Sequence, residues 1–189
     1  MEILLLNIEI VDNFIENKVG NCGELCIFAE SLIYKVDMER FLGNMEAKMD
    51  AKGRVFVPSP FRKSLSQNEQ SKLILRRDIY QPCLVLYPEA IWNAELDALK
   101  AKLNAWNPQH QMILRQFMAE VEILSLDNNG RILIPKRLIA AAKLEETIRF
   151  LGMDTVIELW NAQQTESAFI APEIMMQQVE TILGKEDQI

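Results

Sequence analysis

Two short segments of the sequence combine residue types at a spacing that could bind an anionic or hydrogen-bonding partner. Residues 49–58 read MDAKGRVFVP and residues 126–135 read LDNNGRILIP, and the two segments align without a gap. Aspartate, glycine, arginine and proline coincide in the two copies. Arginine carries a planar guanidinium group with a fixed fork of donors, so Arg54 and Arg131 are the candidate binding residues.

Turn chemistry explains the aspartate and the glycine of each copy. An aspartate accepts hydrogen bonds from backbone N–H groups two or three residues further on, and glycine permits a positive φ. Asp50 and Gly53 therefore predict a turn in copy one, and Asp127 and Gly130 predict a turn in copy two. We expect each aspartate to fix its turn and to orient the arginine of the same copy through a charge-assisted hydrogen bond.

Each turn should lead into a buried strand. Residues 55–57 and 132–134 are β-branched and apolar runs of the kind found in strands. Pro58 and Pro135 end these runs, because proline cannot donate a hydrogen bond to a strand ladder. A short helix is predicted next, at residues 61–65 in copy one.

The remaining elements follow from hydrophobic periodicity. Each copy should contain a hairpin, with strands at residues 73–75 and 83–87 in copy one and at residues 148–151 and 156–160 in copy two. Amphipathic patterns predict helices at residues 89–104, at residues 112–118 and after Phe169, and a strand at residues 121–126. We expect the apolar stripes of these helices to be core, including that of the last helix at Ile174, Met175, Val179, Ile182 and Leu183.

The composition is that of a globular protein. The chain has 189 residues, of which 49% are hydrophobic, enough for one medium domain or two small ones. Charged residues interrupt the apolar stretches before membrane-spanning length, and no basic residue precedes the apolar N-terminus, which predicts a soluble cytoplasmic protein. Cys22, Cys26 and Cys83 have neither the number nor the spacing of a zinc site, so we predict reduced thiols, no metal and no cofactor.

The charge is unevenly distributed along the chain. The formal net charge of −7 argues at first sight against a nucleic-acid partner. Residues 1–37, however, carry seven acids against two lysines, which leaves a charge of only −2 for the rest of the chain. Residues 48–63 and 131–143 are locally basic. These two segments supply the candidate phosphate contacts, namely Lys48, Lys52, Arg62, Lys63, Lys136 and Arg137.

The two motif copies resemble the MraZ family of transcriptional regulators. The similarity extends over about residues 38–182 and includes the sequences MERFLG at 38–43 and LYP at 86–88. The resemblance implies a mainly β fold with flanking helices (α+β), built from duplicated swapped-hairpin half-barrels of the AbrB/SpoVT type that form a pseudo-two-fold, double-ψ-like barrel. The modules would cover residues 38–108 and 109–189, behind an N-terminal extension at residues 1–37.

The resemblance also implies a function. MraZ proteins bind repeated promoter boxes of the division and cell wall gene cluster as ring-shaped homo-oligomers, so the expected partners are double-stranded DNA and further copies of the chain. The expected location is the nucleoid, with no membrane and no small-molecule substrate. The family motif falls on Asp50 and Arg54 and on Asp127 and Arg131. Copy one has Arg62 after its helix start, whereas copy two has Ile139 there, which leaves open whether Arg137 substitutes.

Several alternatives stay open at this point. The chain could be an antitoxin-like or transition-state regulator of the same fold, or a structural ring that binds other proteins. Without the resemblance, Arg54 and Arg131 could be salt-bridge partners within their turns. An enzyme is not expected, because His110 is the sole histidine and there is no glycine-rich phosphate loop, so no catalytic residue is predicted.

The N-terminal extension has two interpretations. Residues 1–37 differ from the rest in charge and precede the family-like sequence, so we expect them to be a start-site artefact with Met38 as the natural first residue. The alternative is a genuine additional arm whose apolar residues at positions 25–28 pack as a helix on a neighbouring chain.

Overall fold

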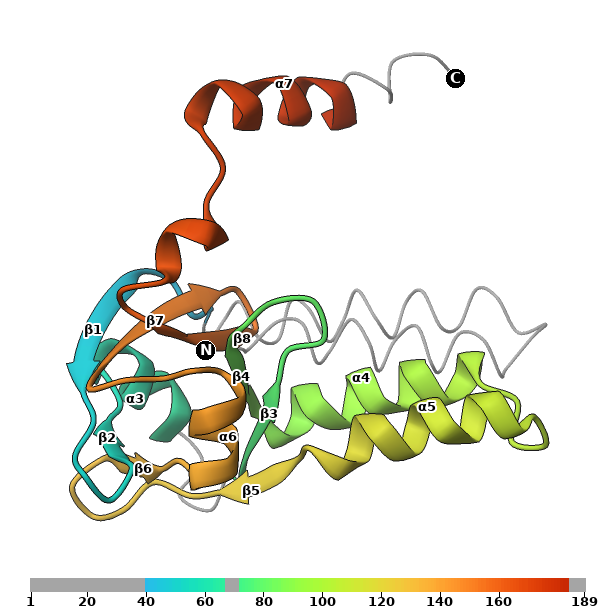
Figure 1. Cartoon of the computed structure of the whole chain (residues 1–189), viewed down its shortest axis with the longest axis horizontal. Helices are drawn as coiled ribbons and strands as arrows, with labels where there is room; N and C mark the ends of the chain where they lie inside the picture. Colours follow the sequence, from blue (N-terminus) through green and yellow to red (C-terminus); the bar gives the residue numbers. More distant parts are fainter. Residues whose placement is uncertain (1–39, 67–71, 184–189) are drawn as a thin grey trace, which may run out of the picture. The chain divides into compact units, whose positions relative to one another are not determined.

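The computed structural model describes residues 40–66 and 72–183 (Figure 1). The N-terminal extension, and with it the question of the natural start, lies outside the described residues. The elements are β1 (Asn44–Lys48), β2 (Arg54–Phe56), α3 (Ser59–Ser66), β3 (Leu73–Arg77), β4 (Leu84–Pro88), α4 (Glu89–Lys102), α5 (Pro108–Ala119), β5 (Glu122–Leu124), β6 (Arg131–Leu133), α6 (Lys136–Ala141), β7 (Thr147–Met153), β8 (Val156–Asn161), the 3-10 helix η1 (Thr165–Ala168) and α7 (Pro172–Leu183). The sequence did not predict β1 or η1, and the other elements follow one another in the predicted order.

The strands form one large sheet and one short ribbon. The sheet has six strands in the order β1-β7-β8-β4-β3-β5, and β2 pairs with β6 in a separate two-stranded ribbon. All of these pairings are antiparallel. The predicted combination of β-structure with flanking helices is confirmed. The predicted closure is not, because the described strands make an open sheet beside a ribbon and no closed barrel.

The edges of the six-stranded sheet join the two halves of the sequence. β1, from the first half, pairs with β7 from the second, in the register Asn44↔Leu151 to Lys48↔Thr147. In the opposite sense, β5 pairs with β3, and Leu73 lies across from Leu124. The two hairpins meet at the centre of the sheet, where β4 pairs with β8. Each half therefore completes the sheet of the other.

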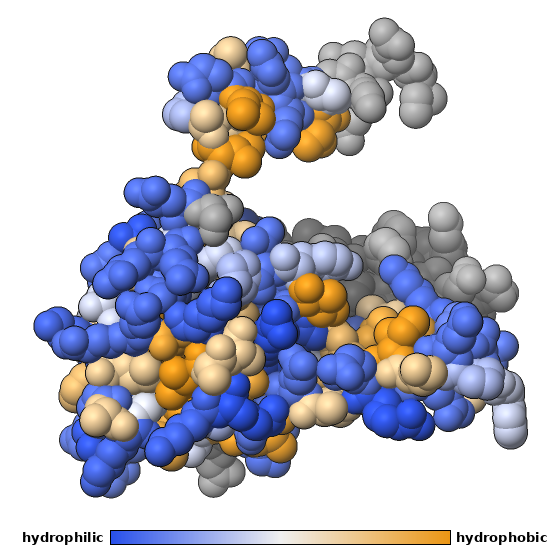
Figure 2. Space-filling view, viewed as in Figure 1, coloured by the Kyte–Doolittle hydropathy of each residue, from blue (hydrophilic) through white to orange (hydrophobic). Residues whose placement is uncertain are grey.

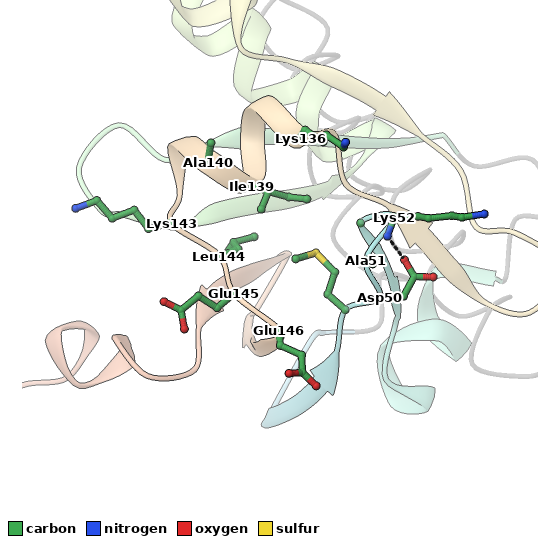
Figure 3. A pocket seen from close by; sticks show the side chains of 12 residues that line it. Asp50, Ala51, Lys52, Lys136, Ile139, Ala140, Lys143, Leu144, Glu145 and Glu146 are labelled. Atoms are coloured by element: carbon green, nitrogen blue, oxygen red, sulfur yellow. Dashed lines mark hydrogen bonds between the residues drawn. The ribbon is translucent and has the colours of Figure 1, made fainter.

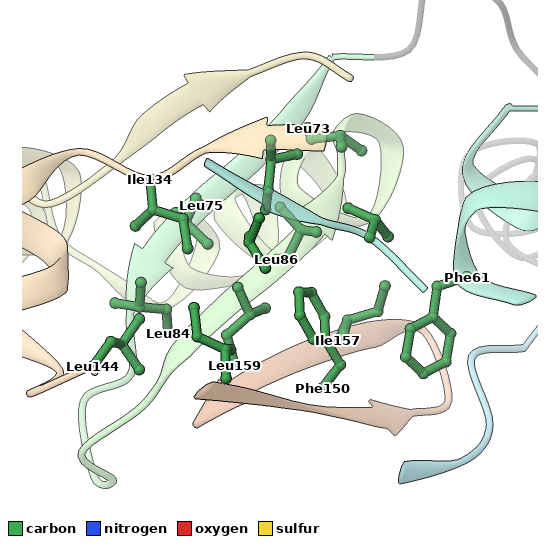
Figure 4. Packing of buried hydrophobic residues seen from close by; sticks show 14 of the residues in the cluster. Phe61, Leu73, Leu75, Leu84, Leu86, Ile134, Leu144, Phe150, Ile157 and Leu159 are labelled. Atoms are coloured by element: carbon green, nitrogen blue, oxygen red, sulfur yellow. The ribbon is translucent and has the colours of Figure 1, made fainter. Parts of the chain in front are cut away.

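The main core lies on one face of this sheet. Side chains alternate between the two faces of a strand, so Leu73 and Leu75 of β3 point the same way and are fully buried. Figure 4 shows them among side chains of β4, β7 and β8, with Phe61 contributed by α3. Val55 and Ile132 of the ribbon close the cluster from the other side and have no exposed surface. Burying a side chain of this size stabilises the fold by about 1.5–3 kcal/mol.

The opposite face of the sheet packs against the helical pair α4–α5. Trp92 of α4 is buried, and its ring stacks on Phe117 of α5 with centroids 5.4 Å apart. Arg76 of β3 places its guanidinium carbon 4.3 Å from the Phe117 ring and is only 5% exposed. β3 is therefore buried on both faces, which explains why it reads as a continuous apolar run rather than as an alternating strand.

Local capping sets the start of α5. The helix begins at Pro108, four residues before the predicted start, because the side chain of Asn107 accepts hydrogen bonds from the backbone N–H of Gln109 and His110. Proline fits the first helical position because the backbone N–H at that position has no acceptor within the helix, so nothing is lost when proline lacks it. β5 is shorter than predicted and ends at Leu124.

The expectation that the helical stripes are core is wrong for α7. All five residues of its predicted stripe are exposed, between 41% and 69%, and Figure 2 shows their apolar surface on this helix. In α4, Trp92 is the single buried residue, and α5 has none, with Met112, Ile113 and Met118 exposed. Periodicity reports that a helix has an apolar face, but not which surface covers that face. Among the described helices, none has the length and hydropathy needed to cross a membrane.

The exchange of strands between halves predicts that a cut chain stays assembled. A protease site inserted between Ala105 and Trp106, in the exposed turn after α4, should leave two fragments that elute together in native buffer. β1–β7 and β3–β5 pairing holds them, so separation should require denaturant. Size-exclusion chromatography before and after cleavage measures this, with the uncut insertion variant as control. Fragments that separate without denaturant would contradict the described strand order.

Candidate nucleic-acid interface

The first turn is held by the carboxylate of Asp50. Its Oδ1 accepts the backbone N–H of Lys52 at 2.9 Å and of Arg54 at 3.0 Å, and its Oδ2 accepts Nε–H of Arg54 at 2.7 Å. The backbone closes the turn as well, because Asp50 N–H donates to the carbonyl of Arg54 and Gly53 N–H donates to the carbonyl of Asp50. One side chain thus fixes the loop and aims the guanidinium group.

The second turn repeats this geometry. Asp127 Oδ1 accepts the backbone N–H of Asn129 and of Arg131, both at 2.9 Å, and Oδ2 accepts Nε–H of Arg131 at 2.8 Å. Corresponding hydrogen bonds in the two turns differ by no more than 0.1 Å. The sequence repeat is therefore also a repeat of side-chain geometry.

These hydrogen bonds affect the ionisation of both aspartates. The backbone N–H of Arg54 has the largest effect and lowers the pKa of Asp50; desolvation opposes it, and the Arg54 guanidinium and the N–H of Lys52 add to the lowering. The pKa of Asp127 is lowered in the same way, first by the backbone N–H of Arg131. Both carboxylates are therefore charged at neutral pH and act as hydrogen-bond acceptors.

Each turn requires its glycine. Gly53 has φ +86° and Gly130 has φ +75°, in the region that other residues rarely adopt. A Cβ on Gly53 would lie 2.7 Å from the carbonyl oxygen of Ile134, while a Cβ on Gly130 would collide with the side chain of Arg62. The close neighbour is a backbone carbonyl at Gly53 and a side chain at Gly130, and both come from the other half of the chain.

The ribbon brings the two arginines onto one surface. In the β2–β6 register, Arg54 lies across from Leu133 and Phe56 lies across from Arg131. Alternation sends Val55 and its partner in β6 into the core, so the four other side chains point away from it. The two arginines consequently occupy diagonal corners of the outer face of a ribbon three residue pairs long.

The outward groups of both arginines are available for a partner. Among the described residues, each aspartate engages its arginine through Nε, and the two terminal nitrogens of Arg54 and Arg131 make no hydrogen bond. The side chain of Arg54 is 38% exposed and that of Arg131 is 23% exposed. Arg131 is less exposed because its guanidinium group lies over the ring of Phe56, with 5.5 Å between the guanidinium carbon and the ring centroid.

The helix of each half covers the turn of the other half. Arg62 of α3 lies over Gly130 and donates from Nη1 to the carbonyl of Asn129 at 3.3 Å. Ile139 of α6 has the equivalent place over Gly53, with its Cδ1 3.1 Å from a Cβ built there. The arginine that copy two lacks is thus replaced by an apolar contact at the same place.

The other predicted cations fall into two groups. Arg137 donates from Nε and Nη2 to Glu122 at 3.0 and 2.7 Å, so it does not take the place of the missing arginine. Lys48 lies 3.4 Å from Glu146, and both side chains are highly exposed. The remaining three cations are exposed to solvent: Lys52, Lys63 and Lys136.

An open hollow of about 810 Å³ lies between the first turn and α6. Figure 3 shows Lys52 and Lys136 on one side of it and Glu145 and Glu146 on another. Its lining therefore has both charges and no excess of either. Within the described residues, no group of three or more His, Cys, Asp or Glu side chains is placed to hold a metal ion.

Two other reactive side chains, the imidazole of His110 and the thiol of Cys83, have structural roles. His110 is half-buried and accepts the backbone N–H of Asn104 on Nδ1 at 2.8 Å, which closes the connection between α4 and α5. Cys83 is fully buried, and burial raises the pKa of its thiol. Cys22 and Cys26 lie outside the described residues.

The sequence reasoning did not select Phe56 and Leu133 as candidate residues. Both were assigned to buried strands, yet each is 54% exposed on the outer face of the ribbon, between the two arginines. The alternation of side chains along a strand could have identified them, because Arg54 and Phe56 face one side of β2 and Val55 faces the other.

Comparison with known proteins now defines the class. A "Transcriptional regulator MraZ" from Phocaeicola vulgatus is 52% identical over 150 residues, covering 79% of this chain and 97% of the relative. The protein of that name from Bacteroides thetaiotaomicron is 48% identical over 151 residues, covering 80% and 97%. A third, from Erwinia tasmaniensis, is 31% identical over 123 residues, covering 65% and 80%. The chain is a transcription regulator, which is not an enzyme class.

The family is equally clear. A family model described as "MraZ protein, putative antitoxin-like" matches residues 40–116 and again residues 117–172. The chain belongs to the MraZ family, as the sequence resemblance predicted.

Substituting the two glycines should separate backbone strain from side-chain collision. Gly53→Ala and Gly130→Ala should each lower the free energy of unfolding by about 1–2 kcal/mol, because both need a positive φ. Adding Arg62→Ala should recover part of the loss in Gly130→Ala and none in Gly53→Ala, where the obstacle is a carbonyl oxygen. Urea denaturation of the wild type, the three single variants and the two double variants completes two double-mutant cycles that share Arg62→Ala; equal recovery in both cycles would contradict the described crossing of halves.

The lowered pKa values of the two aspartates predict a pH dependence of stability. A carboxyl group whose pKa is lower in the folded protein than in the unfolded chain stabilises the fold at pH values above its unfolded pKa, here 3.8. That stabilisation is lost as the pH falls through the pKa of the folded state. The free energy of unfolding should therefore fall below about pH 4, and fall less in the double variant Asp50→Asn, Asp127→Asn. Urea titrations between pH 3 and 6 measure this; identical slopes in both proteins would contradict it.

Proposed function

We propose that this protein is a sequence-specific regulator that reads double-stranded DNA with Arg54 and Arg131. One observation carries the proposal: two aspartate-held arginines point outward from the same face of a two-stranded ribbon. The major groove admits a two-stranded β-ribbon, and a guanidinium fork bonds well to O6 and N7 of guanine. A salt bridge that merely stabilised each turn would not need the terminal nitrogens to face solvent.

The mode of holding each arginine suits base recognition. The carboxylate takes Nε, which fixes the plane and direction of the guanidinium group while leaving its terminal nitrogens as donors. Asp50 and Asp127 are ionised and paired, so their charges are compensated beside the DNA. An arginine already held in its binding direction loses less conformational entropy on contact.

Phosphate contacts are assigned to the cations around the turns. Lys52, Lys63 and Lys136 are exposed, and they would supply affinity that depends on salt and not on base sequence. Lys48 would add to them by exchanging its exposed glutamate partner for a phosphate. Arg62 and Arg137, the other two predicted phosphate contacts, are assigned mainly to positioning.

Family membership supports the finer parts of the proposal. We infer two swapped-hairpin modules, at residues 38–108 and 109–189, from the double match to the family model and the exchanged edge strands. One ribbon contacts few base pairs, so binding should rely on several ribbons of a ring-shaped homo-oligomer engaging repeated promoter boxes. The proposed target is the division and cell wall gene cluster, with the protein at the nucleoid in the cytoplasm.

Two alternatives have a specific observation in their favour. The description "putative antitoxin-like" of the matching family model favours an antitoxin-like regulator of the same fold, although the presence of two modules in one chain argues against it. The exposed apolar face of α7 favours a ring that binds other proteins. A binding selection on random DNA separates the proposals, because a protein-binding ring would enrich no sequence.

Removing either arginine should weaken specific binding. Arg54→Ala and Arg131→Ala should each raise the Kd for the selected duplex at least tenfold, about 1.4 kcal/mol, as the loss of one bidentate base contact does. Binding to a duplex of scrambled sequence should change much less. Fluorescence anisotropy titrations at one fixed salt concentration measure both values.

The matched control is Arg115→Ala. It removes an exposed arginine from α5, in the helical pair that extends away from the ribbon (Figure 1), with the same change in net charge. Its Kd should stay within twofold of the wild-type value. Equal losses in the control and in the two ribbon variants would mean that net charge, and not base reading, explains the effect.

A further inference from the structure

The outer face of the ribbon carries an apolar pair as well as the two arginines. Phe56 and Leu133 occupy the other diagonal of the face, since each lies across from an arginine in the β2–β6 register. Both are 54% exposed, although large apolar side chains on a solvent-facing strand surface oppose solubility. The inner face of the same ribbon is already filled by Val55 and Ile132, so the core needs neither of them.

The charges around this pair indicate what covers it. Arg54 and Arg131 flank the pair, and both aspartates of the turns are neutralised by them. Lys52 and Lys136 are exposed beside the first turn, on a different side of its hollow from Glu145 and Glu146 (Figure 3). An apolar patch with cations at its corners fits a partner whose surface is apolar at points and anionic around them.

The major groove of DNA has this combination. Phosphates line its edges, and thymine is the base that presents a methyl group, at C5, on the groove floor. Resting on the proposed function, we propose that Phe56 and Leu133 recognise thymine methyl groups next to the guanines that Arg54 and Arg131 read. The ribbon would thus discriminate at four positions, by two hydrogen-bonding and two apolar contacts.

Strand dimensions limit where these thymines lie. Arg54 and Phe56 are two residues apart on one strand, which is about 6.8 Å at about 3.4 Å per residue. Successive base pairs rise by about 3.4 Å. A thymine read by Phe56 therefore lies within about two base pairs of the guanine read by Arg54, and the same relation holds for Leu133 and Arg131.

The two apolar residues are not equivalent. Phe56 also touches Arg131, with 5.5 Å between its ring centroid and the guanidinium carbon, so it both positions that arginine and faces the groove. Leu133 lies across from Arg54 and has no ring to stack on it. Leu133 is consequently the cleaner probe of the apolar contact.

The test uses the full chain and the duplex selected from random DNA. Replacing single thymines by deoxyuracil removes one methyl group and leaves every base-pairing atom in place. At two positions near the guanines, this change should weaken wild-type binding about fourfold, as expected for burial of one methyl group. In the Leu133→Ala variant, deoxyuracil at one of these two positions should no longer weaken binding. In the Phe56→Ala variant, deoxyuracil at the other position should no longer weaken binding.

A control variant accounts for loss of apolar surface alone. Met153→Ala removes a 52% exposed apolar side chain from β7, at the end of that strand away from the first turn, and should keep both fourfold effects. Wild-type binding that tolerates every deoxyuracil within twofold would overturn the inference. So would deoxyuracil effects that persist unchanged in both ribbon variants.

The outcomes also separate this inference from the proposed function. If the wild-type chain selects no sequence, or if Arg54→Ala leaves selective binding intact, the proposed reading of DNA fails and the inference fails with it. If the arginine variants lose selective binding while deoxyuracil has no effect, base reading stands and only the apolar contact is refuted.

Discussion

The pairing of β2 with β6 is the constraint on which the candidate site depends. Its inner side chains, Val55 and Ile132, are fully buried, and strand alternation then obliges Arg54 and Arg131 to point outward. A slip of one residue would send the arginines into the core and the aliphatic residues to solvent. The packing that stabilises the domain therefore also sets the direction of the two guanidinium groups.

Duplication within one chain extends this dependence to the turns. Arg62, from the first half, covers the glycine of the second turn, and Ile139, from the second half, covers the glycine of the first. The edge strands are exchanged in the same sense, with β1 on β7 and β5 on β3. Neither half alone supplies the complete surroundings of its own turn.

Local geometry outweighs net charge in this protein. The chain is acidic overall, yet the acids closest to the proposed interface, Asp50 and Asp127, are each bonded to an arginine at 2.7–2.8 Å. A nearby cation compensates such a carboxylate, so a DNA-binding face can exist on a protein of negative total charge. Where the charges lie, and how they are paired, decides which partner the surface can accept.

The sequence by itself determined the two turns and the Asp–Arg pairing, because these follow from residues within a few positions of one another, and the duplicated motif determined the family. Tertiary structure decided the rest. It showed an open sheet in place of the expected barrel, the exposure of α7 and of Phe56, and the burial of Arg76. It also placed Arg62 on a turn 67 residues away. Such contacts depend on how distant segments pack, and local periodicity carries no information about that choice.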